Sequence, residues 1–207
     1  MLTIVIQAGG ESRRMGQDKA LVPFLGQPLI QRVIQRVGGL ADELVINSNR
    51  PEAYAFLDLP VLPDIIPKRG ALGGLYTGLV IARMPLVSVI ACDMPFANAT
   101  LLAEERRLLE ESGADAVIPL TEHGTEPFHA VYRRDRCLPL VKAVLDAGSW
   151  RVNSWFGEAN LLLLSPEEVI RFDPRRLAFR NVNTPEELSQ AEQLAFGESG
   201  SQPEGGW

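Results

Sequence analysis

Short apolar runs rich in β-branched residues alternate along the chain with longer stretches in which apolar residues recur at helical spacing. The short runs predict buried strands and the longer stretches predict helices. The predicted strands cover residues 2–6, 44–46, 61–62, 86–91, 114–119, 127–132 and 161–164. The predicted helices cover residues 29–37, 51–57, 98–111, 135–147 and 185–196. One more helix is expected to follow a glycine-rich loop at 67–75 and to end near Arg83.

Strands that alternate with helices indicate βαβ units, in which helices cover both faces of a mostly parallel sheet. The expected fold class is therefore α/β. No linker of domain size interrupts the pattern, so residues 1–196 are expected to form one domain. Residues 197–207 are rich in Gly, Ser, Pro and Glu, a composition typical of a disordered tail. In such a sheet, ligands bind outside the carboxyl ends of the strands.

The composition excludes several classes of function. Apolar residues make up 46% of the 207 residues and the formal net charge is −6, which argues against non-specific binding to nucleic acid or to a membrane surface. No stretch approaches the roughly 18 to 20 apolar residues of a membrane span, and we expect no signal peptide. The two cysteines, Cys92 and Cys137, do not resemble a disulfide framework, so a cytoplasmic protein is expected.

Positive charge is concentrated in the loop after the first predicted strand, QAGGESRRMGQDKA at residues 7–20. Gly9, Gly10 and a third glycine allow the backbone to approach a ligand, and successive N–H groups in such a loop can bind an anion. Arg14 can fork onto two phosphate oxygens, whereas Lys19 supplies a point charge. The loop matches neither GxGxxG nor GxxxxGK[ST]. It therefore predicts a phosphate site of another kind.

Other polar residues stand at the ends of predicted strands. Asp93 follows an apolar strand, where its carboxylate would face the ligand crevice and, beside a triphosphate, could hold Mg²⁺. Asn47 could be an ordinary turn residue, whereas Asp64 is placed to bind a base or a ribose. Asn181 and Asn183 precede the last helix, where either could be a capping residue. In an extended segment the two asparagines would share one face.

A few residues carry weaker signals. His123 lies in a polar stretch and is expected to be solvated, and His129 lacks a Ser or Cys partner that would make it part of a triad. We expect His129 to be structural. Glu126 and Arg133 border the strand that contains His129 and could face a substrate. Cys92 ends a buried strand and is expected to be a small core residue rather than a nucleophile.

Taken together, the motifs resemble those of the molybdenum cofactor guanylyltransferases. The stretch AGGESRRMGQDKAL is similar to the family's AGGxSxRMGxDKxL, and GALGGL, ACDMPF, EPFHAVY and NVNTPEEL are similar to its later motifs in the same order. The resemblance extends to about Phe196. Sugar-phosphate nucleotidyltransferases and the cytidylyltransferase of the same pathway share the opening motif more loosely, and the Gly-Gly pair favours the guanylyl branch. Gln7 departs from the family pattern, which usually has Leu at this position.

The resemblance implies a single-domain, Rossmann-like, three-layer nucleotidyltransferase fold. It implies transfer of GMP from GTP to molybdenum-molybdopterin, with release of pyrophosphate and with Mg²⁺ as cofactor. Other cofactor-biosynthesis proteins and apo-molybdoenzymes are implied as further partners. A phosphate nucleophile is already anionic, so the reaction needs positioning and charge neutralisation more than a general base.

The resemblance also assigns roles to matching positions. The residues implied to bind the nucleotide are Gln7, Ala8, Gly9, Gly10, Lys19, Asn47, Asp64 and Asp93. The residues implied near the pterin are Asn181 and Asn183. Lys19 and Arg14 would neutralise charge on the leaving pyrophosphate, and Asp93 would hold Mg²⁺ with Asn183 as a second ligand. If Gln7 acts through its backbone the departure is tolerable, and its side chain could also touch the base.

Two alternatives stay open at this point. One is a different nucleotidyltransferase, which would use CTP with the same pterin or a nucleoside triphosphate with a sugar phosphate. The other is a non-catalytic nucleotide-binding protein that carries or senses the cofactor. The presence of both Lys19 and Asp93 argues against a carrier, because a carrier can bind a nucleotide without a carboxylate that positions a metal.

Overall fold

The structure, a computed structural model, describes residues 1–9 and 18–199. Eight strands form the main sheet, in the order β10-β7-β9-β6-β1-β4-β5, with β8 paired to β7 beside this path. The strands are β1 (Leu2–Gln7), β4 (Glu43–Asn47), β5 (Val61–Leu62), β6 (Leu86–Ala91), β7 (Ala116–Thr121), β8 (Gly124–Thr125), β9 (His129–Arg133) and β10 (Leu161–Leu164). A separate hairpin joins β2 (Pro23–Phe24) to β3 (Gln27–Pro28).

The sheet is mostly parallel, which confirms the expectation from sequence. Strand β1 runs parallel to both β4 and β6, β4 runs parallel to β5, and β7 runs parallel to β10. Strand β9 is antiparallel to both of its neighbours, β6 and β7. In this register Gln7 stands between Asn47 on β4 and Ala91 on β6. The carboxyl ends of the central parallel strands therefore meet at one edge.

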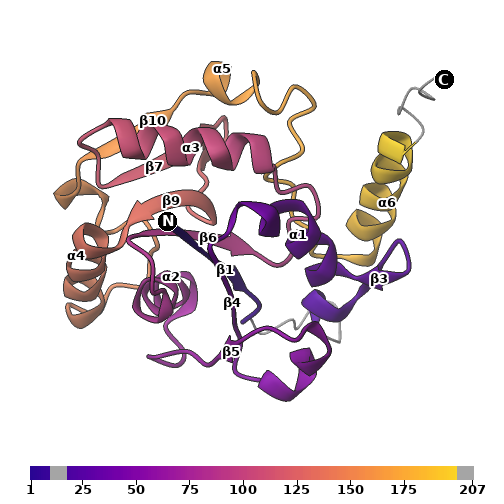
Figure 1. Cartoon of the computed structure of the whole chain (residues 1–207), viewed down its shortest axis with the longest axis horizontal. Helices are drawn as coiled ribbons and strands as arrows, with labels where there is room; N and C mark the ends of the chain where they lie inside the picture. The colour runs from indigo at the N-terminus through magenta and orange to yellow at the C-terminus, as the bar shows by residue number, and fades with distance from the viewer. Residues whose placement is uncertain (10–17, 200–207) are drawn as a thin grey trace.

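Helices cover both faces of the sheet (Figure 1). The α-helices are α1 (Leu29–Val37), α2 (Gly70–Ile81), α3 (Ala99–Glu111), α4 (Arg134–Asp146), α5 (Pro166–Val169) and α6 (Pro185–Ser199). The 3-10 helices are η1 (Lys19–Leu21), η2 (Gly38–Leu40), η3 (Pro51–Leu57) and η4 (Phe156–Glu158). Among the described residues, no helix is both long enough and apolar enough to cross a membrane.

Alternate residues of β1 contribute to two separate cores. Ile4 and Ile6 pack in one cluster with apolar residues of α1 and α3, whereas Val5 packs in a second cluster with residues of α2 and α4. Side chains alternate between the two faces of a strand, so a strand with consecutive apolar residues such as Ile4, Val5 and Ile6 must be covered on both faces. The arrangement confirms the three-layer architecture.

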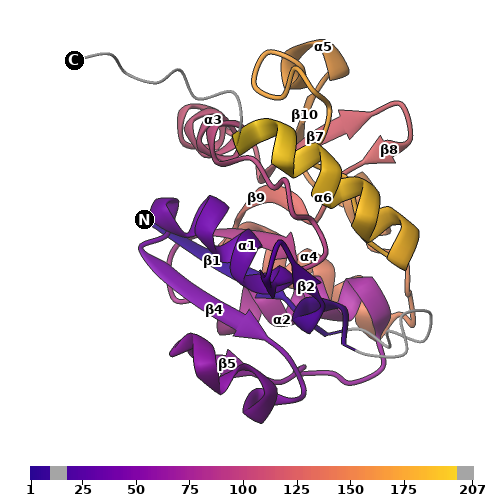
Figure 2. The ribbon, with the colours of Figure 1, turned by 90° about the vertical axis from the view of Figure 1, so that its right-hand side faces the viewer.

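Helix α6 packs outside these layers. Ala191 and Ala195 of α6 join a third cluster with Phe24 of β2 and with Phe96. Figure 2 shows α6 lying over one side of the molecule beside β2. A capping box stands at the start of α6, because the Thr184 hydroxyl accepts from the Glu187 N–H at 3.1 Å and the Glu187 carboxylate accepts from the Thr184 N–H at 3.2 Å. The helix runs to Ser199, three residues past its expected end.

The structure corrects the prediction of a glycine-rich loop at 67–75, because α2 already begins at Gly70. A Cβ added at Gly78 would lie 2.9 Å from Cγ2 of Val89 on β6, so only glycine lets the helix pack this close to the sheet. Glycine lowers helix propensity by about 1 kcal/mol per residue relative to alanine. Close packing against the sheet offsets this cost, and local propensity alone could not reveal it. The β2–β3 hairpin, β8 and α5 were also not predicted.

Candidate active site

A crevice of about 310 Å³ lies at the edge of the sheet where β1 and β6 end. The residues that line it are Gln7, Ala8, Gly9, Asp18, Lys19, Gly70, Ala71, Gly74, Ala91, Cys92, Asp93 and Phe128. They come from the ends of two parallel strands, from η1, from the first turns of α2 and from the residue before β9. This is the position at which parallel α/β sheets bind ligands.

Backbone hydrogen bonds tie the ends of the three central strands together. The Ala8 N–H donates to the carbonyl of Asn47 at 2.9 Å, and the Cys92 N–H donates to the carbonyl of Gln7 at 3.1 Å. The sheet pairing thus continues one residue past each strand. Residues just beyond the strands are therefore held at fixed positions along the rim of the crevice, as a site with preorganised backbone groups requires.

Three side-chain oxygens at or just after the ends of β1, β4 and β5 are buried and have no hydrogen-bond partner among the described residues. They are Oε1 of Gln7, Oδ1 of Asn47 and Oδ1 of Asp64. The other polar atoms of two of these side chains are held, because Asn47 Nδ2 donates to the Leu62 carbonyl at 3.0 Å and Asp64 Oδ2 accepts from Asn49 at 2.9 Å. A buried polar atom without a partner is costly. Such atoms indicate a ligand that donates hydrogen bonds.

The surroundings of Gly9 show that the Gln7 and Asp64 side chains lie near one space, beside the main chain of Asn47. A Cβ added there would lie 3.3 Å from Nε2 of Gln7, 3.8 Å from Oδ1 of Asp64 and 3.9 Å from the Asn47 carbonyl oxygen. Gly74 of α2 makes room for Gln7, since a Cβ at this position would lie 2.8 to 3.0 Å from the Gln7 amide group. The residue that departs from the family pattern thus fits against a glycine.

A second group of polar side chains combines three segments that are far apart in sequence. Lys19, the first residue of η1, donates a hydrogen bond to Oδ1 of Asn183, and its Nζ lies 3.7 Å from Oδ2 of Asp93. The Lys19 and Asp93 side chains are 21% and 20% exposed. The Val182 N–H donates to the Asp93 carbonyl at 2.9 Å and thereby fixes the segment before α6 against the end of β6.

Burial controls the protonation of the two residues after β6. It raises the pKa of the Asp93 carboxyl, and the positive charge of Lys19 opposes this shift. Burial also raises the pKa of the Cys92 thiol, and the neighbouring Asp93 carboxylate acts in the same direction. A thiol with a raised pKa is a poor nucleophile. The prediction that Cys92 is not a nucleophile therefore agrees with its surroundings.

The donor set around Lys19 fits a magnesium ion that also binds phosphate. Within residues 1–9 and 18–199 no group of three or more His, Cys, Asp or Glu side chains could hold a metal ion. Mg²⁺ at phosphate sites, however, takes one or two carboxylates together with phosphate oxygens and water. The carboxylate of Asp93 and the amide oxygen of Asn183 both face Lys19 and could supply the protein's share.

Asp18 positions Lys19, and sequence reasoning did not identify this role. The Asp18 carboxylate caps η1 by accepting from the Ala20 N–H at 3.1 Å, and it also accepts from the hydroxyl of buried Tyr54 at 2.6 Å. Arg50 forms an ion pair with the same carboxylate. The only signal in the sequence is the Asp-Lys dipeptide at the end of the opening motif.

The structure places the remaining predicted residues as follows. Gly10 and Arg14 lie outside the described residues. Ala8 is buried beside the crevice and Gly9 is exposed at its rim. Of the two late asparagines, Asn183 contacts Lys19, whereas Asn181 is exposed to solvent. The structure therefore does not bring the two asparagines together at Lys19.

His129 has the structural role that the sequence predicted. Its Nε2 accepts from the N–H of Asn98 at 3.0 Å, so Nδ1 must carry the proton and donate to Glu105 at 3.0 Å. Both side chains are fully buried, and burial raises the pKa of the Glu105 carboxyl. The pair fixes the start of α3 against β9. His123 is exposed, as predicted.

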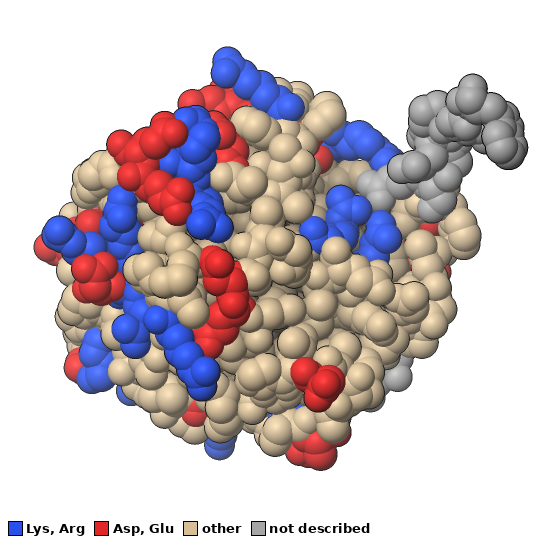
Figure 3. Space-filling model, viewed as in Figure 1, with Lys and Arg blue, Asp and Glu red and all other residues tan. Residues whose placement is uncertain are grey.

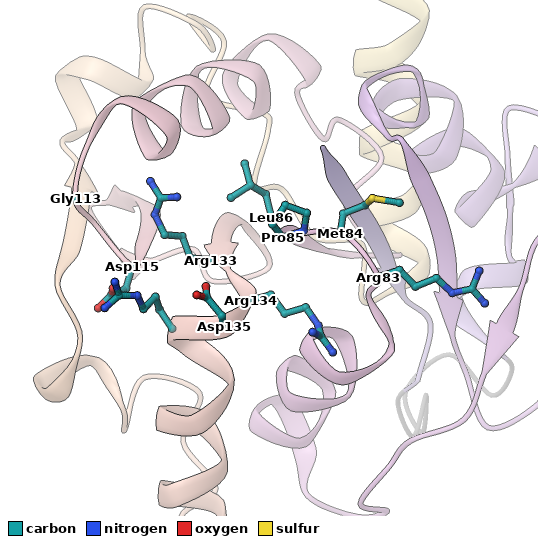
Figure 4. Close-up of a pocket in the computed structure, with 10 residues that line it drawn as sticks. Arg83, Met84, Pro85, Leu86, Gly113, Asp115, Arg133, Arg134 and Asp135 are labelled. Atoms are coloured by element: carbon teal, nitrogen blue, oxygen red, sulfur yellow. The ribbon is translucent and has the colours of Figure 1, made fainter.

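A larger cavity, about 660 Å³ in volume, lies at the opposite edge of the sheet (Figure 4). Arg83, Arg133, Arg134 and Arg136 line it together with Asp115. Arg133 donates to the carbonyls of Leu109, Ser112 and Ala114 around the end of α3, and Arg134 donates to carbonyls at the end of α2. These two guanidinium groups donate hydrogen bonds to backbone carbonyls at helix ends, so their role is structural rather than anion binding. Arg133 thus does not face a substrate in the crevice.

Charge on the face shown in Figure 3 does not single out another site. On the face shown in Figure 3, Lys and Arg side chains are interspersed with Asp and Glu side chains and do not form one field of a single sign. Mixed charge of this kind is typical of a solvated surface. It agrees with the overall net charge of −6.

Comparisons with known proteins identify relatives over most of the chain. Residues 4–159 match the family model of the MobA-like NTP transferase domain. A "Probable molybdenum cofactor guanylyltransferase" of Peptoclostridium acidaminophilum is 36% identical over 198 residues, which covers 92% of this chain and 88% of that protein. A "Molybdenum cofactor guanylyltransferase" of Desulfosudis oleivorans is 33% identical over 192 residues, covering 92% and 94%.

A solved structure shows the same fold. The crystal structure of "Molybdopterin-guanine dinucleotide biosynthesis protein A" from Archaeoglobus fulgidus superposes with a TM-score of 0.82 at 24% identity, covering 94% of this chain and 99% of that chain. The comparison confirms the predicted α/β fold with its largely parallel sheet.

Proposed function

The chain belongs to the MobA-like NTP transferase family, and from this premise we propose that it transfers GMP from GTP to molybdenum-molybdopterin and releases pyrophosphate. The observation that supports the choice of site is that two different groups of polar side chains lie along this edge of the sheet. Buried oxygens that have no partner within residues 1–9 and 18–199 lie at the ends of β1 and β4 and just after β5, and the Lys19–Asp93 pair lies near the end of the neighbouring strand β6. One group suits a base that donates hydrogen bonds, and the other suits phosphates.

Guanine matches the first group by its pattern of hydrogen-bond donors. Its N1–H and N2–H₂ groups present three hydrogens on one edge, and Gln7, Asn47 and Asp64 each have a buried acceptor oxygen without a partner among the described residues, at or just after the ends of the neighbouring strands β1, β4 and β5. The Gln7 amide group packs against Gly74, and its Oε1 is buried without a partner among the described residues, so this side chain adds an acceptor that the leucine common in the family would lack. We assign Gln7, Asn47 and Asp64 to the guanosine and the backbone of Ala8, Gly9 and Gly10 to the nucleotide.

The transfer step needs charge neutralisation and alignment. An oxygen of the acceptor's terminal phosphate bonds to the α-phosphorus of GTP, the bond from that phosphorus to the β-bridging oxygen breaks, and pyrophosphate leaves with the electron pair. Lys19 lies where it can neutralise the leaving charge, and we assign Arg14 the same role. Asp93 and Asn183 would hold Mg²⁺, which when bound neutralises phosphate charge. Asn181 stays a predicted pterin contact.

The wider setting follows from the same proposal. Cys92 and Cys137 form no disulfide, which supports a cytoplasmic location. Contacts with other cofactor-biosynthesis proteins and with apo-molybdoenzymes stay predictions that follow from the resemblance.

One experiment tests the proposal against both alternatives. The protein is incubated with Mg²⁺ and with GTP, CTP or ATP, in the presence of molybdenum-molybdopterin or a sugar phosphate, and pyrophosphate release is followed. We expect release only with GTP and the pterin acceptor. Release with CTP or with a sugar phosphate instead would identify another nucleotidyltransferase. Tight GTP binding without release for any acceptor would identify a carrier.

A further inference from the structure

A groove of about 490 Å³ lies beside the crevice and has no role in the proposal so far. It runs between the β7–β8 hairpin and the segment that includes α5. The residues that line it are Leu120, Thr121, Glu122, His123, Glu126, Pro166, Glu167, Val169, Ile170, Asp173, Arg176, Phe179 and Arg180. Five of these residues are apolar and eight are polar or charged, and a volume of this size is typical of sites for small molecules.

Two segments connect this groove to the crevice. Glu126 lines the groove and Phe128 lines the crevice, and a step of two residues spans at most about 7 Å. Phe179 lines the groove, and Asn183, which contacts Lys19, follows four residues later, a span of at most about 14 Å. The groove therefore lies within reach of the Lys19–Asp93 pair, on the side of β9 and β7, opposite to the side of β4 and β5.

We propose that this groove binds the pterin ring of the acceptor, with Glu126 accepting hydrogen bonds from the 2-amino group and the adjacent ring N–H. The inference rests on the proposed function. With guanosine over β1, β4 and β5 and the pterin over β7 and β9, the acceptor's phosphate and the donor's α-phosphate meet between them at Lys19 and Asp93. The groove is called the acceptor groove below.

Glu126 has the properties that this contact needs. Its side chain is half-buried, and burial raises the pKa of the carboxyl. Among the described residues, its carboxylate accepts one hydrogen bond, from the Thr121 hydroxyl at 3.3 Å. Two carboxylate oxygens can accept in parallel from two neighbouring donors on a planar ring. The 2-amino group and the adjacent N–H of a pterin form such a pair of donors.

The walls of the acceptor groove suit the rest of a flat, polar ring. Phe179 is half-buried, and its ring packs edge-on against the buried His129 ring with centroids 5.3 Å apart, which fixes its orientation. A fixed aromatic ring offers a surface for stacking. Arg180 donates from Nη2 to Gln190 of α6 at 2.8 Å, which holds the guanidinium at the wall. A guanidinium there can donate to the 4-oxo group of a pterin.

Guanine carries the same edge as a pterin, an amino group beside a ring N–H, so the acceptor groove could in principle hold the base of GTP. A substitution of Glu126 distinguishes the two. It should raise the KM for the pterin acceptor if the groove binds the pterin, and the KM for GTP if the groove binds guanine. Glu126→Gln keeps the shape of the side chain but replaces one acceptor oxygen by a donor, which opposes the donors of the ring. Glu110→Gln on α3 is the matched control, because Glu110 is exposed and does not line the acceptor groove.

We expect Glu126→Gln to raise the KM for molybdenum-molybdopterin by at least about tenfold and to leave the KM for GTP within about twofold, because the lost contact is to the acceptor alone. The control should change neither constant. A rise in the KM for GTP instead would place guanine in this groove and overturn the proposal. Unchanged constants for both substrates would also overturn it.

A binding experiment with the unaltered chain keeps the proposal testable if the variant does not fold. The probes are the fluorescent rings 6-hydroxymethylpterin and 6-hydroxymethyllumazine, which carries a 2-oxo group in place of the amino group. We expect the pterin to bind at least about tenfold tighter, because a carboxylate repels the 2-oxo group, and GTP should not displace it. Equal affinities, or displacement by GTP, would overturn the inference.

The two proposals fail in different ways. If the unaltered chain releases pyrophosphate from GTP with the pterin acceptor, while Glu126→Gln keeps both KM values, the acceptor groove is wrong and the proposed function stands. If pyrophosphate is never released, the proposed function fails, whatever the ring-binding experiment shows.

Discussion

The crevice at the carboxyl edge of the sheet and the cavity at the opposite edge differ in what their polar groups contact. The opposite cavity is the larger, about 660 Å³ against about 310 Å³, and four arginines line it. Arg133 donates hydrogen bonds to carbonyls at the end of α3, and Arg134 donates to a carbonyl at the end of α2. At the crevice, Gln7 has a buried oxygen without a partner among the described residues, and so does Asn47, its neighbour on β4.

The difference shows that volume and charge do not by themselves identify a site. An arginine whose donors are satisfied by backbone carbonyls stabilises the fold, and an anion would have to displace those carbonyls to bind. An acceptor that is buried without a partner costs stability until a ligand donates to it. The smaller cavity is therefore the better candidate, and substitutions in the two cavities should have opposite effects on activity and stability.

The sharpest test pairs the same substitution in both cavities. Asp93→Asn removes the carboxylate beside Lys19, and we expect turnover with GTP and Mg²⁺ to fall at least about 10³-fold, because this carboxylate would hold the Mg²⁺ that neutralises the phosphate charge. Asp115→Asn in the opposite cavity should leave kcat unchanged. Steady-state pyrophosphate release measures both. Full activity of Asp93→Asn would remove this carboxylate from the site, provided that thermal unfolding shows both variants to be folded.

Lys19→Ala should have the next largest effect. We expect kcat/KM for GTP to fall about 10²-fold, because the substitution removes a positive charge that neutralises the leaving pyrophosphate. Lys142→Ala is the control, since Lys142 is exposed on α4 and pairs only with Asp146 one turn away among the described residues. Its kinetics should match those of the unaltered chain. If Lys19→Ala also keeps its kcat/KM for GTP, the residue has no part in phosphate binding.

Arg133→Ala should show the reverse pattern of a large effect on stability with none on catalysis. Its guanidinium donates to three backbone carbonyls, so we expect the free energy of unfolding to fall by about 2 kcal/mol. Urea denaturation measures this loss, and kcat should not change. Arg136→Ala, at an exposed position in the same cavity, should change stability by less than about 0.5 kcal/mol. A drop in kcat for Arg133→Ala would contradict our comparison of the cavities.

Gln7→Leu should give the smallest effect and restores the residue common in the family. Inosine lacks the 2-amino group of guanosine, so the preference for GTP over ITP reports a contact to that group. We expect this preference to fall about tenfold in kcat/KM when the Gln7 oxygen is removed. Gln35→Leu, exposed on α1, should leave the preference unchanged. An unaltered preference in Gln7→Leu would mean that this side chain does not read the base.

Much of the fold could be predicted from apolar patterning. β1, α1 and β6 lie within one residue of their predicted bounds, because a continuous apolar run or a regular helical period marks each of them. The start of α2 could not be predicted, since three glycines in its first five residues indicate a loop unless the packing of Gly78 against Val89 is known. The short β2–β3 hairpin carries no comparable signal.

The candidate site was predictable residue by residue but not as an arrangement. Asp93 and Asn47 stand at strand ends that the apolar pattern already marked. That Lys19 contacts Asn183, which lies 164 positions away, depends on the packing of α6 against β2 and on the Val182 hydrogen bond to Asp93. The role of Asp18, which joins η1 to buried Tyr54, depends in the same way on contacts between distant segments.

By itself, the sequence determined the order of strands and helices, the family resemblance and the residue types that could bind phosphate. These properties depend on local periodicity and on motifs, and both can be read along the chain. Only the tertiary structure decided which polar groups have partners. Arg133 and Gln7 look equally available in the sequence, yet one donates to three carbonyls and the other keeps a buried oxygen without a partner among the described residues. Hydrogen-bond satisfaction depends on distances between segments far apart in the chain, and it therefore separates a structural residue from a candidate ligand-binding one.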